Sequence, residues 1–358
     1  MRPRYFCLLL SIPGLVPGVS PAQAVPRTDT PRAGTVRVTF DPVVSAWDNE
    51  FTPAGKRPIG ASLPAPVFVH AERRVTPLTV EVGLTSRIAL SVRLPLVRTM
   101  IRAGHSPDSA SAVLDSLLAD TTYAYSPIEN TRRGLHYFAG DAELAAKLRL
   151  GPSTGHYEAA AQILVRLPTG HLDSPNDLFD LSTGDHQSDV ELSVIQELTV
   201  TRHVWLNLSV RAAQQRPGRR ERRVAPQDSL LVPHAATALL DWNPGDYVAA
   251  DFAPMYRFNP YFAAGVTVGY FTKRRDRYSF ASPADSVALA TRLGSPRSAS
   301  VLDAGTSERR LRLGVAVTYL GRSGEGALSF EQTVSGAGGR IPVTSVFRIV
   351  LRFSRWPF

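Results

Sequence analysis

The chain has 358 residues, with 40 Lys and Arg against 31 Asp and Glu and a formal net charge of +9. Its single cysteine excludes intrachain disulfides and zinc sites built on several cysteines. Beyond the first 24 residues no apolar run approaches the ~20 residues of a membrane helix, so the chain could insert into a membrane only as a β-barrel.

The start of the chain predicts a secretory signal peptide over 1–24. Arg2 and Arg4 precede an apolar stretch that ends in the small-residue sequence Ala22-Gln23-Ala24. Pro and Gly within this stretch disfavour an ordinary helix. Because secretion is expected, nucleic acid is not an expected partner in spite of the basic charge. The remaining residues, 25–358, are expected to form one domain.

Twelve segments alternate apolar and polar residues with the period of two that indicates β-strands. In the seventh, Val204, Leu206 and Leu208 alternate with more polar neighbours. Several segments reach the ~9 to 11 residues that a tilted strand needs to cross a membrane. The twelve are 35–40, 75–85, 88–100, 141–150, 159–169, 189–200, 203–211, 247–258, 261–271, 309–320, 327–335 and 343–358.

The connections between these segments alternate between long and short. The long ones are 41–74, 101–139, 170–188, 212–246 and 272–308. The short ones are 86–87, 151–157, 201–203, 259–260 and 321–326. This pattern predicts an antiparallel transmembrane barrel of about twelve strands, with short periplasmic turns and long extracellular loops. A soluble β-sandwich gives no reason for such sorting.

Two of the long connections contain helical signals. The segments 106–120 and 282–294 each open with Ser-Pro, an N-cap followed by proline at the first helical position. We expect these helices to lie over the mouth of the barrel as structural lids, with a substrate gate as the alternative.

Aromatic residues gather near the ends of the eighth and ninth segments, as the aromatic belts of membrane proteins do. One group lies at a tight turn and comprises Tyr256, Phe258, Tyr261 and Phe262. A second group lies at the opposite ends of the same segments and comprises Tyr247, Tyr270 and Phe271. We expect both groups to mark membrane interfaces.

Three runs in the central third of the chain resemble a known family. They are GDAELAAKLRL (140–150), ILVRLPTG (163–170) and LSTGDHQSDVEL (181–192). They are similar to outer-membrane barrels grouped as transporters of the meta-pathway of phenol degradation. The resemblance implies an outer-membrane barrel and solute uptake more firmly than it implies phenol as the solute.

The C-terminus resembles the aromatic signature that the barrel assembly machinery reads, with Phe358 last and Trp356 two positions before it. In that signature the apolar residues share the phase of the final Phe. Here Arg352 and Ser354 occupy that phase, and Phe353 occupies the other. A β-bulge near Ser354 would bring the two faces together.

With the apolar faces toward lipid, the opposite faces line the interior. Basic residues outnumber acidic ones there, which would favour anions or polarised solutes. The alternative is that Arg and Glu neutralise each other and fill the barrel, since twelve strands fall between filled and open barrels. The predicted pore-lining residues are Glu81, Arg93, Glu143, Lys147, Arg149, Arg166, Glu191, Glu197, Arg211, Asp251, Arg257, Arg310, Arg312, Glu331 and Arg348.

Two outer loops concentrate charge of one sign. Carboxylates gathered in one loop could hold calcium, although their spacing matches no EF-hand and solvated Asx turns explain them. These acids are Asp173, Asp177, Asp180, Asp185 and Asp189. The basic run RPGRRERR (216–223) suits lipopolysaccharide phosphates, or is a solvated loop.

No catalytic motif stands out, because none of the eight histidines falls in a His-Glu-x-x-His helix and no serine in a Gly-x-Ser-x-Gly elbow. We therefore predict no enzyme, no metal and no cofactor. The predicted function is uptake of small solutes, aromatic or anionic, across the cell outer membrane. Expected partners are outer-membrane lipid, lipopolysaccharide and the barrel assembly machinery. The alternatives are a surface or adhesion protein and a lipid-modifying enzyme.

Overall fold

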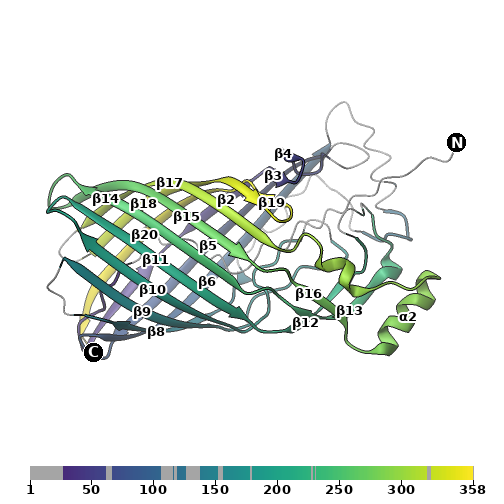
Figure 1. The fold of residues 1–358 in the computed structure, drawn as a ribbon, viewed down its shortest axis with the longest axis horizontal. Helices are drawn as coiled ribbons and strands as arrows, with labels where there is room; N and C mark the ends of the chain where they lie inside the picture. Colours follow the sequence, from purple (N-terminus) through teal and green to yellow (C-terminus); the bar gives the residue numbers. More distant parts are fainter. Residues whose placement is uncertain are drawn as a thin grey trace.

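The computed structural model describes residues 27–61, 67–105, 116, 119–125, 138–151, 156–177, 180–226, 229, 231–320 and 324–357. Within them the chain forms a closed antiparallel β-barrel of twelve wall strands (Figure 1). None of the helices in these ranges is long and apolar enough to cross a membrane.

The first wall strand is split into two halves. β1 (Thr35–Phe40) and β2 (Val43–Trp47) both pair with β5 on one side and with β20 on the other. The break falls at Asp41 and Pro42, where proline cannot donate to the ladder. Pairing of the first strand with the last closes the barrel and leaves no free edge in the wall.

Each of the twelve predicted segments corresponds to one wall strand, so the predicted fold class is confirmed. After the split strand they are β5 (Val67–Gly83), β6 (Ile88–His105), β8 (Glu143–Arg149), β9 (Tyr157–Arg166), β10 (Asp189–Thr199), β11 (Val204–Gln215), β14 (Tyr247–Arg257), β15 (Phe262–Lys273), β17 (Glu308–Leu320), β18 (Gly324–Ala337) and β20 (Ser345–Pro357).

Several strands extend further than the alternation predicted. β5 begins at Val67 rather than near Val75, and β2 lies within the stretch predicted as a loop. The added part of β5 contains Glu72, Arg73 and Arg74. Such polar ends lie beyond the apolar part of the barrel, so hydrophobic periodicity no longer marks them as strands.

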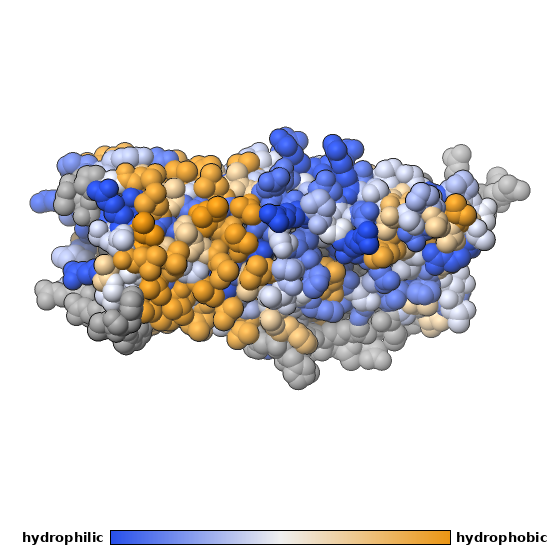
Figure 2. Space-filling model, turned by 90° about the horizontal axis from the view of Figure 1, so that it is seen from below, coloured by the Kyte–Doolittle hydropathy of each residue, from blue (hydrophilic) through white to orange (hydrophobic). Residues whose placement is uncertain are grey.

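Apolar side chains cover the outside of the barrel as a belt. On β6, for example, Ile88, Leu90, Val92, Leu94 and Leu96 are all exposed. Figure 2 shows the belt as an orange band, with hydrophilic residues beyond it on one side. A contiguous apolar surface of this extent, wrapped around a closed barrel, is what a membrane-spanning barrel presents to hydrocarbon.

The two ends of the barrel differ. The short turns lie at one end together with the C-terminus, and the longer connections lie at the other (Figure 1). We refer to them as the short-turn end and the long-loop end. The C-terminal strand also contains the predicted bulge, because its pairing with β1 shifts register between Trp356 and Ser354. Phe358 lies outside the described residues.

The long connections contain two small sheets instead of irregular loops alone. One consists of β12 (Gly218–Arg223), β13 (Thr237–Asn243) and β16 (Arg277–Phe280), and the other of β19 (Ile341–Pro342), β3 (Asn49–Thr52) and β4 (Gly55–Pro58). The two-residue strand β7 (Phe138–Ala139) pairs with β6. The short helices η1 (His234–Ala236) and η2 (Ala299–Asp303) also lie in these connections.

The second predicted helix is present as α2 (Pro283–Leu293). The Ser282 side chain caps it by accepting from the Asp285 backbone amide, and Gly294 ends it in the left-handed conformation. Leu289 packs with Leu240 of β13 in a small core of the long-loop end. Most of the first predicted helix, 106–120, lies outside the described residues.

One of the two predicted aromatic groups behaves differently from the expectation. Tyr256, Tyr261 and Phe262 are exposed near the short-turn end. Tyr247 and Phe271 are instead buried against each other inside the barrel, with ring centroids 5.4 Å apart. Their position in the alternation places them on the inner face, so the prediction was wrong for these two residues, whereas Tyr270 of the same group is exposed.

Candidate functional site

The barrel encloses a cavity of about 140 Å³. Side chains from ten segments of the chain surround it, from the N-terminal residues and β1 round the wall to β14, and from β20. Its charged and polar lining residues are Arg27, Asp29, Arg37, Thr39, Asp41, Thr79, Glu81, Ser91, Arg93, Glu143, Lys147, Gln162, Glu191, Ser193, Ser209, Arg211, Asp251 and Arg352. The cavity is therefore a polar space within a barrel whose outside is apolar.

Seven of the side chains predicted to face the interior line this cavity. They are Glu81, Arg93, Glu143, Lys147, Glu191, Arg211 and Asp251. Each occupies the polar phase of its strand, opposite the residues of the apolar belt. Alternation along each strand thus brings together residues that lie up to 170 positions apart.

A chain of ion pairs runs along the wall formed by β6, β8, β9 and β10. Arg93 contacts Glu143 at 3.1 Å, and Arg166 contacts Glu143 at 3.4 Å and Asp189 at 2.8 Å. Arg166 and Asp189 are almost completely buried. Buried charges need partners of this kind, because an unpaired buried charge is strongly destabilising. The chain of ion pairs therefore favours this register of the four strands.

A second chain of ion pairs joins the opposite wall. Asp251 of β14 accepts from Arg211 at 3.2 Å and from Arg312 at 3.0 Å, and Arg312 also contacts Glu331 at 3.4 Å. These pairs link β11, β14, β17 and β18. Much of the charge predicted to face the interior is therefore engaged within the wall.

The remaining predicted residues lie away from the cavity, each with its own partner. Arg149 pairs with Glu158 at 2.7 Å, and Glu197 pairs with Arg27 at 3.1 Å. The other partners are Trp205 for Arg257, Glu308 for Arg310 and Asp41 for Arg348.

The charge balance around the cavity differs from the sequence-based expectation. Six basic and six acidic side chains line it, so no basic excess exists at this point. The difference arises partly because Asp29 and Asp41, which lie outside the predicted strands, also reach the cavity. Basic residues such as Arg149 and Arg310 lie elsewhere. The cavity thus lacks the net positive charge that would favour anions.

Sequence reasoning missed four contributors from the N-terminal part of the chain and one from the last strand. They are Arg27, Asp29, Arg37, Asp41 and Arg352. Arg27 and Asp29 lie in a segment with no periodicity. Arg37 could have been found, because it alternates with Val36 and Val38 in the first predicted strand. Arg352 could also have been found, because it alternates with the outward-facing Leu351 and Phe353 and shares the phase of Arg348.

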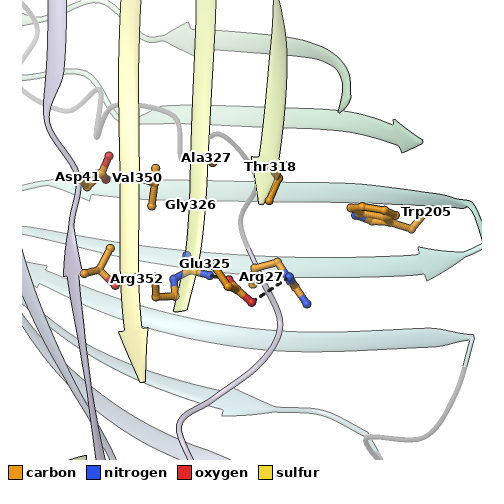
Figure 3. A pocket seen from close by; sticks show the side chains of 10 residues that line it. Arg27, Asp41, Trp205, Thr318, Glu325, Gly326, Ala327, Val350 and Arg352 are labelled. Carbon is orange, nitrogen blue, oxygen red and sulfur yellow. Dashed lines mark hydrogen bonds and ion pairs between the residues drawn. The ribbon is translucent and has the colours of Figure 1, made fainter. Parts of the chain in front are cut away.

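A smaller pocket of about 30 Å³ adjoins the cavity and shares Arg27, Thr39, Asp41 and Arg352 with it. Trp205, Ala327 and Val350 supply its apolar surface. Arg27 forms an ion pair with Glu325 across this pocket (Figure 3). Small or apolar residues, among them Ala253, Met255, Ala263 and Ala316, are buried on the nearby strands. The interior is therefore charged on one side and partly apolar on the other.

The connection between β9 and β10 folds into the long-loop end of the barrel. Asp141 accepts from the backbone amides of Gly170 at 2.8 Å and Asp185 at 2.9 Å. Arg73, on the inner face of β5, donates to the carbonyl of Thr183 at 3.0 Å. A Cβ on Gly184 would lie 2.4 Å from the Asp141 carboxylate, so a side chain at this position would displace the carboxylate from the two amides. This connection therefore narrows the interior of the barrel at the long-loop end.

The acidic loop does not bring its five carboxylates together as one group, although Asp185 lies close enough to Asp189 to interact with it. Asp173 pairs with Arg220 and Arg222, both at 2.6 Å, whereas Asp189 pairs with Arg166. Among the described residues no group of acids, histidines or cysteines could hold a metal ion. Burial raises the pKa of Asp173, but its two guanidinium partners outweigh this and lower the pKa overall.

The basic run RPGRRERR forms β12 and uses much of its charge internally. Besides the two arginines bound to Asp173, Arg223 donates to the carbonyls of Tyr123 and Val232, both at 2.6 Å. Arg219 is the exposed arginine of β12, with 65% of its side chain accessible. A solvated loop, one of the two interpretations of this run, was therefore wrong for Arg220, Arg222 and Arg223.

No protein-family model and no curated protein matches the sequence. Among solved structures, the COG4313 outer membrane channel from Pseudomonas putida F1 has a TM-score of 0.59 at 12% identity, over 92% of this chain and 98% of that one. This likeness shows a shared barrel fold.

Two further structures match with lower scores. The NanC porin has a TM-score of 0.38 at 7% identity, over 89% of this chain and 98% of that one. The TodX deltaS2S3 mutant monoaromatic hydrocarbon channel has a TM-score of 0.39 at 10% identity, over 91% of both chains. At these scores they add nothing to the fold assignment.

Proposed function

We propose that this protein is an outer-membrane channel that admits small solutes. The observation that carries the proposal is the combination of an apolar belt outside a closed barrel with a charged cavity inside it. A barrel filled by its own side chains would have the same polar lining but would leave no internal space between them. The likeness to a solved outer membrane channel over 92% of the chain is consistent with it.

The orientation follows from the two ends of the barrel. Short turns face the periplasm in outer-membrane barrels, so the short-turn end is assigned to that side. We further propose that a signal peptide over 1–24 directs secretion and that Trp356 and Phe358 form the assembly signal for insertion into the outer membrane. N-terminal sequencing of the secreted protein is expected to begin at Val25. An uncleaved start at Met1 would refute the signal.

The proposed solute is small and either uncharged or amphiphilic. Equal numbers of basic and acidic side chains around the cavity give little reason to select anions. The apolar surface of Trp205, Ala327 and Val350 can contact an aromatic ring. The resemblance to barrels of the phenol-degradation pathway supports the same class of solute.

Planar lipid bilayers provide the test of the channel. The reconstituted protein is expected to produce stepwise conductance, with a reversal potential close to zero in a KCl gradient because the cavity is charge-balanced. Correctly folded protein that inserts and yet conducts nothing would refute the channel. A strongly anion-selective reversal potential would show that the balanced charge of the cavity does not set the ion selectivity.

The alternative function is that of a surface protein that transports nothing, and one observation favours it. The β12–β13–β16 sheet and α2 form a folded layer at the long-loop end, with its own core around Leu240 and Leu289. Such a layer could bind an external partner. This alternative predicts altered adhesion on loss of the gene, with solute influx unchanged.

A lipid-modifying enzyme has less support from the described histidines. The ring nitrogens of His156 and His203 contact the carbonyls of Thr199 and Arg257, and His171 lies 3.7 Å from Asp180. Purified protein is expected to release no fatty acid from phospholipid vesicles. Release that disappears on replacing a single histidine would establish the enzyme instead.

A further inference from the structure

Residues Arg27–Gly34 form a segment that crosses the short-turn end of the barrel, and we call it the strap. Its beginning is fixed to β9 and β10. The Thr28 amide donates to Glu197 at 2.7 Å, and the Thr28 hydroxyl donates to Glu158 at 3.0 Å. Its end is fixed to β5, because the Gly34 amide donates to the carbonyl of Gly83 at 2.9 Å.

The anchoring points lie on different sides of the ring of strands. Arg27 contacts Glu197 of β10 at 3.1 Å and Glu325 of β18 at 3.5 Å. Going round the closed wall, β11, β14, β15 and β17 separate β10 from β18. Both acids lie near the short-turn ends of their strands. A segment that reaches both of them and also β5 must span the opening.

The strap is tightly packed against the wall. Thr28 has no accessible surface, and Pro31 is buried. Lys147 donates to the carbonyl of Asp29 at 2.8 Å, and the Asp29 carboxylate contacts Arg37 at 2.6 Å. These contacts hold both the backbone and the side chain of Asp29.

Glycine is required where the strap meets β5. A Cβ placed on Gly83 would lie 2.2 Å from the carbonyl oxygen of Arg32. Only a residue without a side chain lets the two backbones approach so closely. The wall strand is therefore adapted to the presence of the strap.

Arg27 lies where the two internal spaces meet. Its side chain lines both the larger cavity and the adjoining pocket. In Figure 3 a dashed line joins Arg27 to Glu325 and marks this ion pair. About a quarter of each side chain is accessible, 27% for Arg27 and 29% for Glu325. This pair is longer and more open than the pair between Arg27 and Glu197.

We propose that the strap is the constriction at the periplasmic end of the channel, and that the Arg27 guanidinium, held between Glu197 and Glu325, sets the size of the opening. This inference rests on the proposed channel function. It makes Arg27 a size-determining residue for neutral solutes. Because its charge is balanced by two carboxylates, its main effect is on the width of the passage.

The test compares two arginines of the strap by liposome swelling with neutral sugars of increasing size. Arg27→Ala removes a side chain that lines the passage. Arg32→Ala makes the same change of charge in the same segment, but this side chain is exposed. Arg27→Ala is expected to raise the swelling rate at least about twofold and to admit larger sugars, whereas Arg32→Ala keeps the rate of the unchanged protein.

Arg27→Gln provides a second variant if Arg27→Ala does not fold, and heat-modifiable migration on gels reports folding for each protein. Faster swelling with either Arg27 variant, even when the unchanged protein is silent, supports the strap as the constriction. If the unchanged protein is active and the Arg27 variants swell at the same rate as it and as Arg32→Ala, the inference about the strap is refuted while the channel stands. Silence of all folded variants refutes both the inference and the channel.

Discussion

Asp41 and Arg348 lie 307 positions apart in the chain and form a buried, doubly hydrogen-bonded ion pair inside the barrel. Asp41 stands at the break between β1 and β2, and Arg348 stands on β20. Both guanidinium contacts reach the same carboxylate, a bidentate geometry that fixes orientation as well as distance. The pair therefore joins the first wall strand to the last, where the barrel closes.

Arg348→Ala is expected to destabilise the barrel strongly, because it leaves the Asp41 carboxylate buried without its main partner. Breaking a buried pair from one side costs about 3 to 5 kcal/mol. Arg219→Ala is the control, since its pair with Asp241 is exposed and contributes less than about 1 kcal/mol. Urea unfolding in lipid vesicles measures both, and equal stability of the two variants would contradict the closing role.

Because of the apolar belt, the cost in folding free energy of an introduced charge should depend strongly on its position. Val266 is an exposed residue in the middle of β15, between the outward-facing Phe262 and Tyr270. Val266→Arg is expected to cost about 2 to 4 kcal/mol of folding free energy in lipid. Val287, even more exposed on α2, is the matched control and should tolerate arginine. If both substitutions had the same small effect, Val266 would not face hydrocarbon.

Asp185, in the connection between β9 and β10, predicts a pH-dependent stability. Burial, with the carboxylates of Asp189 and Asp141, raises its pKa from 3.8 to about 8. Between about pH 4 and pH 8 the Asp185 carboxyl is protonated in the folded state and ionised in the unfolded state. Its contribution to the free energy of unfolding is therefore present at acid pH and is lost as the pH rises from about 4 to 8.

The measurement for Asp185 is the urea midpoint at pH 5 and at pH 9. The unchanged protein is expected to lose stability between these values, and Asp185→Asn is expected to lose less because its side chain cannot titrate. Equal losses in both proteins would show that another group is responsible.

The wall of the barrel could be predicted from the sequence because a single physical rule sets it. A strand between lipid and an aqueous interior must alternate, as Leu90, Ser91, Val92 and Arg93 do in β6. That rule placed all twelve strands and the seven predicted residues around the cavity. It stopped where the strands leave the apolar belt, which is why the first half of β5 was expected to be a loop.

The position of the strap and the folding of the outer connections could not be predicted in the same way. Nothing in the sequence around Arg27 shows that its partner would be Glu197, because the contact depends on which strands face each other across the closed ring. The same holds for Asp173 with Arg220 and Arg222, which were interpreted as separate acidic and basic loops. Pairing between distant segments leaves no periodic signal.

Thiol labelling along β6 tests the central claim, that charged faces line a wetted interior and apolar faces meet lipid. Cys7 is the only cysteine and precedes the expected cleavage site, so an introduced thiol has no competitor. Ser91 lines the cavity, and its neighbour Val92 is exposed on the outside. In reconstituted vesicles, Ser91→Cys is expected to react with a water-soluble, membrane-impermeant reagent, and Val92→Cys only with a lipid-soluble one. The reverse pattern would contradict the account.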